Sequence, residues 1–187
     1  MNAFLSYIEG FIRLSPESKA AMAAVLQPMD FPKGHLLLRP GGICQTLFFI
    51  ESGLARTWYL KNGKDVTDWI SAEGTIAVSI VSFLTRRPDI RGIELLEPST
   101  IWALSHADLE SLYNTYPEID RLGRLLISAG IVQLQQRFDD LHFSTAQQRY
   151  RQLITESPTL VNRVPLSMIA SYLGITQETL SRIRAQF

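Results

Sequence analysis

The chain has 187 residues, 46% of them hydrophobic, and a formal net charge of zero. This length allows one sensor-sized hydrophobic core plus a small second one, and it excludes three domains. Because the chain has no run of about 18 apolar residues and an early glutamate at its N-terminus, we expect a cytoplasmic protein without a membrane span or cleaved signal.

The first predicted elements are helical and span residues 1 to 28. Ser15 can cap a helix that has Pro16 at its first position, because a serine hydroxyl accepts from free N–H groups there. Apolar residues from Ala20 to Leu26 recur at helical spacing. Pro28 is expected to end this helical stretch.

From Phe31 to about Ile101 the chain contains short β-type runs separated by turn residues. The runs are His35 to Leu38, Thr46 to Ile50, Leu54 to Leu60, Val66 to Ile70, Ile76 to Ile80 and Ile93 to Leu96. Asn62 and Gly63 can both adopt the positive φ that a type I′ hairpin turn requires. Strands of this length and spacing predict a small antiparallel barrel or sandwich.

A long helix is predicted from about Glu118 to Leu141, after a short helix that Ser105 caps and Pro117 interrupts. Its apolar residues form two stripes on opposite faces. The stripes are Ile127, Ile131, Leu134, Phe138 and Leu141 on one face, and Leu122, Leu125, Ala129 and Val132 on the other. Two apolar faces need two partners, which we expect to be the barrel and the same helix of a parallel dimer. Burial of both faces within one monomer is the alternative.

The C-terminal segment differs in charge from the rest of the chain. From Ser144 to Phe187 there are five arginines and two glutamates, a net charge of +3, which leaves −3 on residues 1 to 143. This asymmetry predicts an anionic partner at the C-terminal end. Arginine suits bidentate contacts with guanine or phosphate better than lysine does.

The last residues are predicted to form a pair of helices, after a helix from Ser144 to Thr155. Gly174 lies where the first helix of the pair must stop and turn, and Thr176 can cap the second. One face of the second helix carries Leu180, Ile183 and Phe187, and the other carries Gln177, Glu178, Ser181 and Arg182. Such polar side chains pair with base edges, so the pattern is typical of a DNA-recognition helix. An ordinary amphipathic helix with a solvated polar face is an equally good interpretation of the helix pair alone.

Three segments resemble the Crp/Fnr family of bacterial transcription regulators. IASYLGITQETLSRIR resembles the recognition segment, and FPKGHLLLRPGG and LFFIESGLARTWYLKNGKDVTDWISAEG are similar to the early barrel of the cyclic-nucleotide-binding fold. The resemblance implies an α+β fold, with an antiparallel β-roll or jelly-roll sensor domain over residues 1–117. It also implies a dimerisation helix over 118–143 and a small helix-turn-helix domain over 144–187.

The function implied by this resemblance is transcription regulation by a homodimer that binds double-stranded DNA, with RNA polymerase as a further partner. The implied DNA-binding residues are Gln177, Glu178, Ser181, Arg182, Arg184 and Arg149. Glu178 and Arg182 correspond to residues that read base edges in the family. Gln177 stands where the cyclic-AMP receptor branch has another arginine, which leaves the operator sequence open. The alternative is a sensor or scaffold module whose terminal helix pair binds protein instead of DNA.

The cyclic-nucleotide site of the family is altered in this sequence. Members that bind cyclic AMP carry a Gly-Glu pair for the ribose and an arginine for the phosphate. The pair falls here on Val78 and Ser79, and the arginine falls on Asp89, whose carboxylate repels phosphate. We therefore expect a vestigial or repurposed pocket, no binding of cyclic AMP, and an effector that is unknown or absent. The pocket candidates are Val78, Ser79, Arg86, Arg87 and Arg91, the arginines being either substitute cations or solvated surface residues.

Residues that hold metals or perform catalysis are sparse. Cys44 is the single cysteine, which excludes a disulfide within the chain and cysteine-ligated clusters, and we interpret it as a buried, inert thiol. His35, His106 and His142 are interpreted as structural, so no haem, other cofactor or metal is expected. Without a G-x-S-x-G elbow, a metal-ligand cluster or a phosphate loop, an enzyme is not expected.

Overall fold

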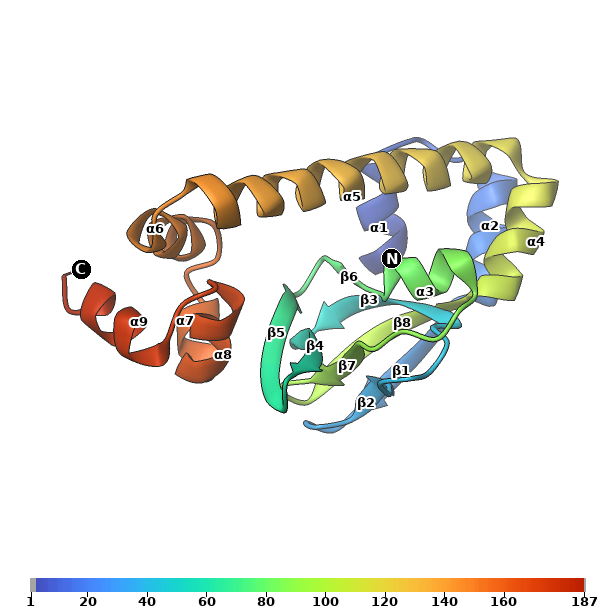
Figure 1. Ribbon diagram of the computed structural model, residues 1–187. Coiled ribbons are helices and arrows are strands. Elements are labelled where there is room, and N and C mark those ends of the chain that lie inside the picture. Colours follow the sequence, from blue (N-terminus) through green and yellow to red (C-terminus); the bar gives the residue numbers. More distant parts are fainter. Residues whose placement is uncertain (1–2, 187) are drawn as a thin grey trace.

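The computed structural model describes residues 3–186, so Met1, Asn2 and Phe187 lie outside it. Within that range the chain has N-terminal helices, a β-barrel, one long helix and a C-terminal group of helices (Figure 1). The N-terminal helices are α1 (Ala3–Glu9) and α2 (Pro16–Val25). This arrangement confirms the predicted α+β class.

The barrel consists of two antiparallel sheets. Its strands are β1 (Gln27–Phe31), β2 (Leu36–Leu38), β3 (Thr46–Ser52), β4 (Ala55–Lys61), β5 (Lys64–Ser71), β6 (Ile76–Ala77), β7 (Gly92–Leu95) and β8 (Ser99–Ser105). The strand orders are β1-β8-β3-β6 and β2-β7-β4-β5. The predicted hairpin joins β4 to β5, where Asn62 and Gly63 have φ values of 52° and 76°.

The N-terminal prediction was partly wrong. The helical stretch is interrupted between α1 and α2, and α2 ends at Val25, before Pro28. Pro28 lies inside β1, paired with Trp102 of β8. Because β1 is an edge strand, a residue without an N–H group is tolerated there. Ser15 caps α2 as predicted, accepting from a backbone N–H at 3.2 Å.

The predicted run from Ile76 to Ile80 is also different in the structure. Its first two residues form β6, and Ile80 begins helix α3 (Ile80–Thr85). Arg86 ends that helix in the left-handed conformation, with a φ of 57°. A short apolar run does not distinguish a strand from a helix by periodicity, so only packing decides between them. Strand β8 also extends past Ile101, as far as Ser105.

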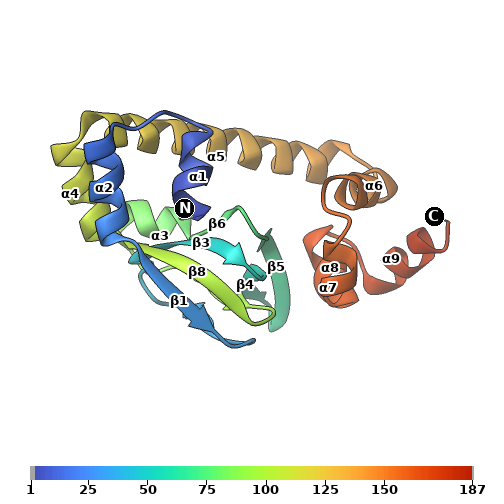
Figure 2. The same cartoon turned by 180° about the vertical axis from the view of Figure 1, so that it is seen from behind.

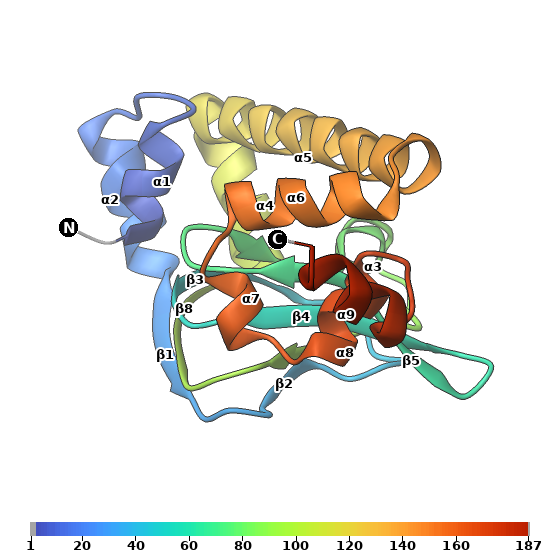
Figure 3. The same ribbon diagram turned by 90° about the vertical axis from the view of Figure 1, so that its left-hand side faces the viewer.

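Helix α5 (Pro117–Phe143) follows the capped helix α4 (His106–Thr115) and runs over the barrel to the C-terminal helices. Figure 2 shows α1, α2 and α4 beneath its first half. The C-terminal helices are α6 (Ala146–Glu156), α7 (Leu160–Arg163), α8 (Leu166–Tyr172) and α9 (Gln177–Arg184). Figure 3 shows them in front of β4 and β5, with α6 below α5.

Two clusters of buried apolar residues hold the molecule together. The larger lies between the sheets and under α1, α2, α4 and the start of α5, and it includes Ile50, Ile101 and Ile119. The smaller joins the C-terminal helices to two barrel residues, Leu54 and Leu96. The barrel and the C-terminal helices therefore share a core instead of being connected by α5 alone.

Candidate nucleic-acid interface

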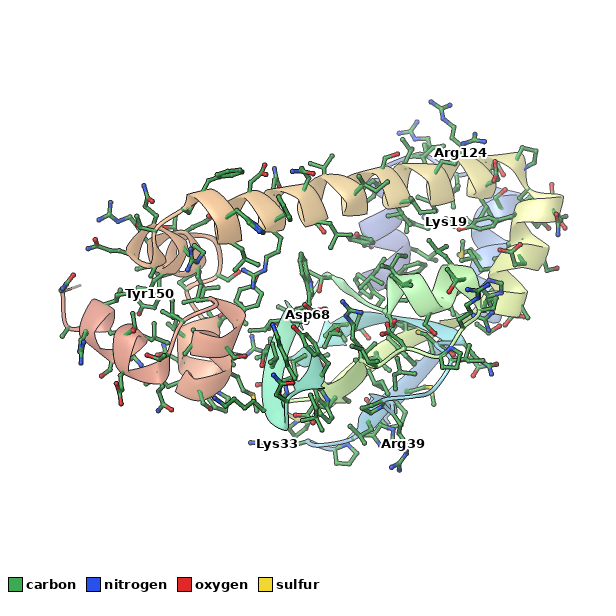
Figure 4. All side chains as sticks on the ribbon, in the orientation of Figure 1. Lys19, Lys33, Arg39, Asp68, Arg124 and Tyr150 are labelled. Atoms are coloured by element: carbon green, nitrogen blue, oxygen red, sulfur yellow. The ribbon has the colours of Figure 1, made fainter. Side chains whose placement is uncertain are left out.

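The C-terminal helices pack around the smaller apolar core. Tyr150 and Leu153 of α6, Leu160 of α7, Ile169 of α8 and Leu180 of α9 are buried together. Tyr150 lies among these helices in Figure 4. Because residues from every helix of the unit meet in this core, the core holds α9 at a defined angle.

Helices α8 and α9 form the predicted helix pair. Gly174 in the turn has a φ of 68°, in the left-handed region that favours glycine. Thr176 caps α9, its hydroxyl accepting from a first-turn backbone N–H at 3.1 Å. Leu180 and Ile183 face the core and are buried. Phe187, which was expected on the same face, lies outside the described residues.

The opposite face of α9 is exposed. The expected base-reading residues on it are all open to solvent: Gln177, Glu178, Ser181, Arg182 and Arg184. Beside them lies an open surface pocket of about 490 Å³, between α9 and Leu166 of α8. Glu178 lies in the first turn of α9 and Arg182 in the last, so each charge is opposite to the partial charge of its helix end.

Arg149 has different surroundings from those expected of a phosphate contact. It is only partly exposed, and its guanidinium donates to the backbone carbonyls of Leu173, at 2.9 Å, and Asp140, at 3.3 Å. It also donates to the carbonyl of Ser144. These bonds tie the end of α5, the start of α6 and the α8–α9 turn together. We therefore propose a structural role for Arg149, and its expected contact with DNA stays a prediction.

The second half of α5 has an exposed apolar face. The expected dimer residues expose large fractions of their surface to solvent: 40% for Ile127, 61% for Ile131, 51% for Leu134, 51% for Phe138 and 40% for Leu141. On the opposite stripe Leu122 is buried, Leu125 and Ala129 are partly exposed, and Val132 is 55% exposed. Burial of both stripes within one monomer, the alternative interpretation, is therefore wrong.

The segment between β6 and β7 contains the expected ligand-pocket residues. Ser79 and Asp89 are both buried, and the Ser79 hydroxyl donates to the Asp89 carboxylate. Arg91 donates to the same carboxylate from its backbone N–H and its guanidinium, each at 3.2 Å. Its Nε reaches Asp68 of β5 at 2.6 Å. Figure 4 shows Asp68 on the side of the barrel nearest the C-terminal helices.

These contacts keep the Asp89 carboxylate ionised. Burial alone would raise the pKa of Asp89, but hydrogen bonds from Ser79 and Arg91 and the charge of Arg91 outweigh it and lower the pKa. An anionic side chain thus occupies the place expected for a cation. Its partners are other side chains of the same chain.

The remaining pocket candidates have varied positions. Arg86 donates to the carbonyls of Cys44 at 2.7 Å and Phe83 at 3.2 Å. Arg87 is exposed, and Val78 packs partly buried against the barrel core. Cys44 is buried as predicted, and burial raises the pKa of its thiol.

A cavity of about 280 Å³ lies in another part of the barrel. It opens to solvent and is lined mainly by β1, β2, β3 and β8, with Phe31, Leu36 and Phe48 among its apolar lining and Ser105 and Asp108 among its polar lining. The pocket candidates of the β6–β7 segment do not line it. The position of this cavity therefore differs from that of the expected nucleotide pocket.

Comparison with known proteins agrees with this architecture. Residues 28–116 match the family of cyclic nucleotide-binding domains. FixK2 from Bradyrhizobium japonicum is 16% identical, with a TM-score of 0.73 over 87% of this chain and 84% of FixK2. A protein from Eubacterium rectale described as a Crp/Fnr-family regulator is 16% identical, with a TM-score of 0.73 over 97% of this chain and 87% of its own. The chain has the fold of the Crp/Fnr regulators.

The Crp/Fnr fold is also seen in the catabolite activator protein of Thermus thermophilus. That protein is 20% identical, with a TM-score of 0.59 over 94% of this chain and 84% of its own. No curated protein matches the chain by sequence. Across residues 3–186, none of the helices has the length and apolar character needed to cross a membrane.

Some residues at the junction of barrel and C-terminal helices were not singled out by the sequence. Arg163 of α7 contacts Glu73 and Glu97 of the barrel, and Ser171 of α8 contacts Thr67 of β5. These pairs are separated by 66 to 104 residues along the chain. No local pattern marks such contacts, because they depend on how the two units dock.

Proposed function

We propose that this chain is a homodimeric, sequence-specific DNA-binding transcription regulator whose small-molecule effector is unknown or absent. The observation that carries the proposal is the exposed polar face of α9, held on a buried helix pair in a chain with the Crp/Fnr fold. The charge of +3 on residues 144–187 favours an anionic partner. In this proposal the protein works in the cytoplasm by binding rather than catalysis, with RNA polymerase as a further partner.

Base reading is assigned to Glu178 and Arg182. They are four residues apart on α9 and therefore project from one side of it. In the major groove the carboxylate accepts from cytosine N4, while the guanidinium pairs with guanine O6 and N7. Gln177, Ser181 and Arg184 add contacts to bases and phosphates around them.

The proposal divides the chain into three functional segments. Residues 1–117 form the sensor-like domain, 118–143 the dimerisation helix and 144–187 the DNA-binding domain. The exposed stripe of α5 pairs with its copy in a second chain, because exposed apolar residues at heptad spacing are buried most effectively by a parallel twin. A two-fold dimer then reads an inverted repeat with half-sites about one helical turn apart.

The proposal assigns no cyclic nucleotide to the β6–β7 segment. Asp89 is ionised and already bonded to Ser79 and Arg91. A phosphate placed beside this carboxylate would bring a second buried anion without a second cation, which is strongly unfavourable. The pocket is therefore either closed by its own side chains or used for a different effector.

Selection of bound sites from random DNA, followed by gel-shift measurements across salt concentrations, tests the proposal. We expect an inverted-repeat site, and we expect the logarithm of the binding constant to fall linearly as the logarithm of salt concentration rises. DNA binding that is absent at low salt would refute the proposal. A protein partner captured by the α8–α9 pair in that case would favour the scaffold alternative.

A further inference from the structure

The C-terminal helices pack on the outer face of the β2-β7-β4-β5 sheet. Ala55 and Leu95 point into the barrel core, whereas their neighbours Leu54 and Leu96 belong to the core of the C-terminal helices. Leu54 directly precedes β4 and Leu96 directly follows β7, so the second core begins at the ends of these strands. Ile70 of β5 also packs against that core, which brings this sheet into contact with both cores. Leu54 is fully buried and Leu96 is 7% exposed, so this part of the contact between the two units is closed to solvent.

Helix α8 also covers the edge of this sheet. Strand β5 is the last strand of the order, so one side of it has unpaired backbone groups. The Thr67 N–H is satisfied by the hydroxyl of Ser171 of α8, at 2.9 Å. Thr67 is 2% exposed, so its amide is protected from water only while α8 remains docked. This amide is therefore a reporter of docking.

Arg163 connects the two units by charge. Its guanidinium bonds Glu73, in the β5–β6 turn, through Nη1 at 3.0 Å and Nη2 at 2.5 Å. It also bonds Glu97, in the β7–β8 turn, through Nη2 and through Nε at 3.4 Å. Glu73 in addition accepts from the backbone N–H of Gly53 at 3.0 Å, so the barrel holds that carboxylate in position.

The ion cluster is partly shielded from water. The side chains of Arg163, Glu73 and Glu97 are 26%, 40% and 29% exposed. Hydrogen bonds from Arg163 lower the pKa of Glu73 to about 2, so the carboxylate is ionised at neutral pH. A single exposed ion pair stabilises little, but a guanidinium shared by two carboxylates in fixed geometry is more effective.

We propose that Arg163 is a positioning residue, which binds Glu73 and Glu97 together and so holds α9 in one orientation on the barrel. This inference rests on the proposed function, because an ordered α9 matters only if α9 binds DNA. The polar face of α9 stays exposed in the docked arrangement, so docking and DNA contact are compatible. A unit that is already ordered loses less freedom on binding than a mobile one.

The test removes the carboxylates instead of the arginine. Replacing Arg163 would take a positive charge from the DNA-binding unit and weaken DNA binding by electrostatics alone. Glu73→Gln combined with Glu97→Gln removes two negative charges from the barrel. Electrostatics alone then predicts tighter DNA binding, whereas loss of positioning predicts weaker binding, so the sign of the change distinguishes the two.

In the full chain we expect the double variant Glu73→Gln/Glu97→Gln to bind its selected DNA site about tenfold more weakly, the effect of lost preorganisation. We also expect faster hydrogen exchange at the Thr67 amide. The control is Glu17→Gln/Glu110→Gln, which changes the charge equally on exposed residues of α2 and α4. It should leave Thr67 exchange unchanged and should not weaken DNA binding.

A rescue variant tests the geometry of the cluster. Exchange of the charges, with Arg163→Glu, Glu73→Arg and Glu97→Arg in one chain, should restore slow exchange at Thr67 relative to Arg163→Glu alone. Unchanged Thr67 exchange with equal or tighter DNA binding in Glu73→Gln/Glu97→Gln would overturn the inference. If the wild-type protein binds no DNA, the proposed function fails, and Thr67 exchange in the same variants still decides whether the cluster holds the helices.

Discussion

Arg182 and Arg149 belong to the same group of helices but have different surroundings. Arg182 is exposed near the end of α9, on the face that projects away from the domain core. Arg149 is bonded to the carbonyls of Leu173, Asp140 and Ser144. Loss of the first side chain should remove a contact with DNA, whereas loss of the second removes a donor that three backbone carbonyls share.

Arg182→Ala should therefore affect DNA recognition and not folding. We expect a loss of roughly 1 to 3 kcal/mol of binding free energy on the selected site and a much smaller loss on random DNA. Gel-shift titration on both DNAs measures the difference. An equal loss on the two DNAs would show that Arg182 contacts the backbone and does not read bases.

Arg149→Ala should reduce stability. Removing hydrogen bonds to carbonyls in a partly buried site lowers the free energy of unfolding by about 1 to 3 kcal/mol. Urea denaturation of this variant measures the loss, with Arg182→Ala as the control that should unfold like the wild type. Normal stability combined with uniformly weaker DNA binding would return Arg149 to the role of a phosphate contact.

Cyclic AMP should not bind at physiological concentration. Asp89 is an ionised carboxylate whose hydrogen-bonding partners are Ser79 and Arg91, so a cyclic phosphate would meet repulsion where it needs a cation. Isothermal titration calorimetry should show no saturable heat. A micromolar dissociation constant would mean that a neighbouring arginine, such as Arg86 or Arg87, serves as the phosphate cation.

At the scale of elements, α5 has two kinds of environment along its length. Its first turns pack on the barrel, where Ile119 and Leu122 are buried, and its later turns expose Ile131, Leu134 and Phe138. In a single chain these exposed apolar side chains do not contribute the free energy that their burial would provide. A helix with this division between its halves is suited to pack on its own domain first and on a partner afterwards.

Ile131→Glu together with Leu134→Glu should therefore prevent dimer formation. A charge buried in an apolar seam costs several kcal/mol, which exceeds what the neighbouring contacts can offset. Analytical ultracentrifugation should show a wild-type dimer and a monomeric or insoluble variant. A wild-type protein that sediments as a monomer at micromolar concentration would contradict the assignment of this stripe.

At the scale of the whole molecule, α5 and the docked helices make the barrel and the C-terminal unit one body. The guanidinium of Arg137 of α5 donates to the backbone carbonyl of Tyr172. The Cζ atom of Arg137 lies 3.9 Å from the centre of the Tyr172 ring, over its face. Together with the Arg163 cluster and the shared core at Leu54 and Leu96, this contact fixes α8 on two sides. The orientation of α9 is thus set by contacts outside its own helix pair.

The Arg163 cluster should give the protein a specific dependence on pH. The pKa of Glu73 is about 2 in the folded chain, below the ordinary value of 4.5, because Arg163 bonds its ionised form. A lowered pKa means that the stabilisation is complete above about pH 4.5 and is lost as pH falls towards 2. Urea denaturation of wild type and Glu73→Gln should show a wild-type advantage that shrinks below pH 4.5. An advantage that is constant across this range would contradict the ion pair.

Much of the local structure could be predicted because it depends on neighbouring residues. The hydroxyls of Ser105 and Thr176 cap α4 and α9, and Asn62 and Gly63 form the hairpin turn. These features satisfy backbone groups within a few residues, so sequence spacing is sufficient to find them. Pro28 was different, because its tolerance in β1 depends on the strand lying at a sheet edge.

By itself, the sequence determined the caps, the turns, the two stripes of α5 and the division of charge between body and C-terminus, since each is a property of spacing or composition. The tertiary structure alone decided which carbonyls Arg149 bonds, how far each stripe of α5 is exposed and that Ser79 faces Asp89. It also brought Arg163 to Glu73 and Glu97, which lie 90 and 66 residues away. Contacts over such separations depend on how whole elements pack against one another, and local sequence patterns do not predict that packing.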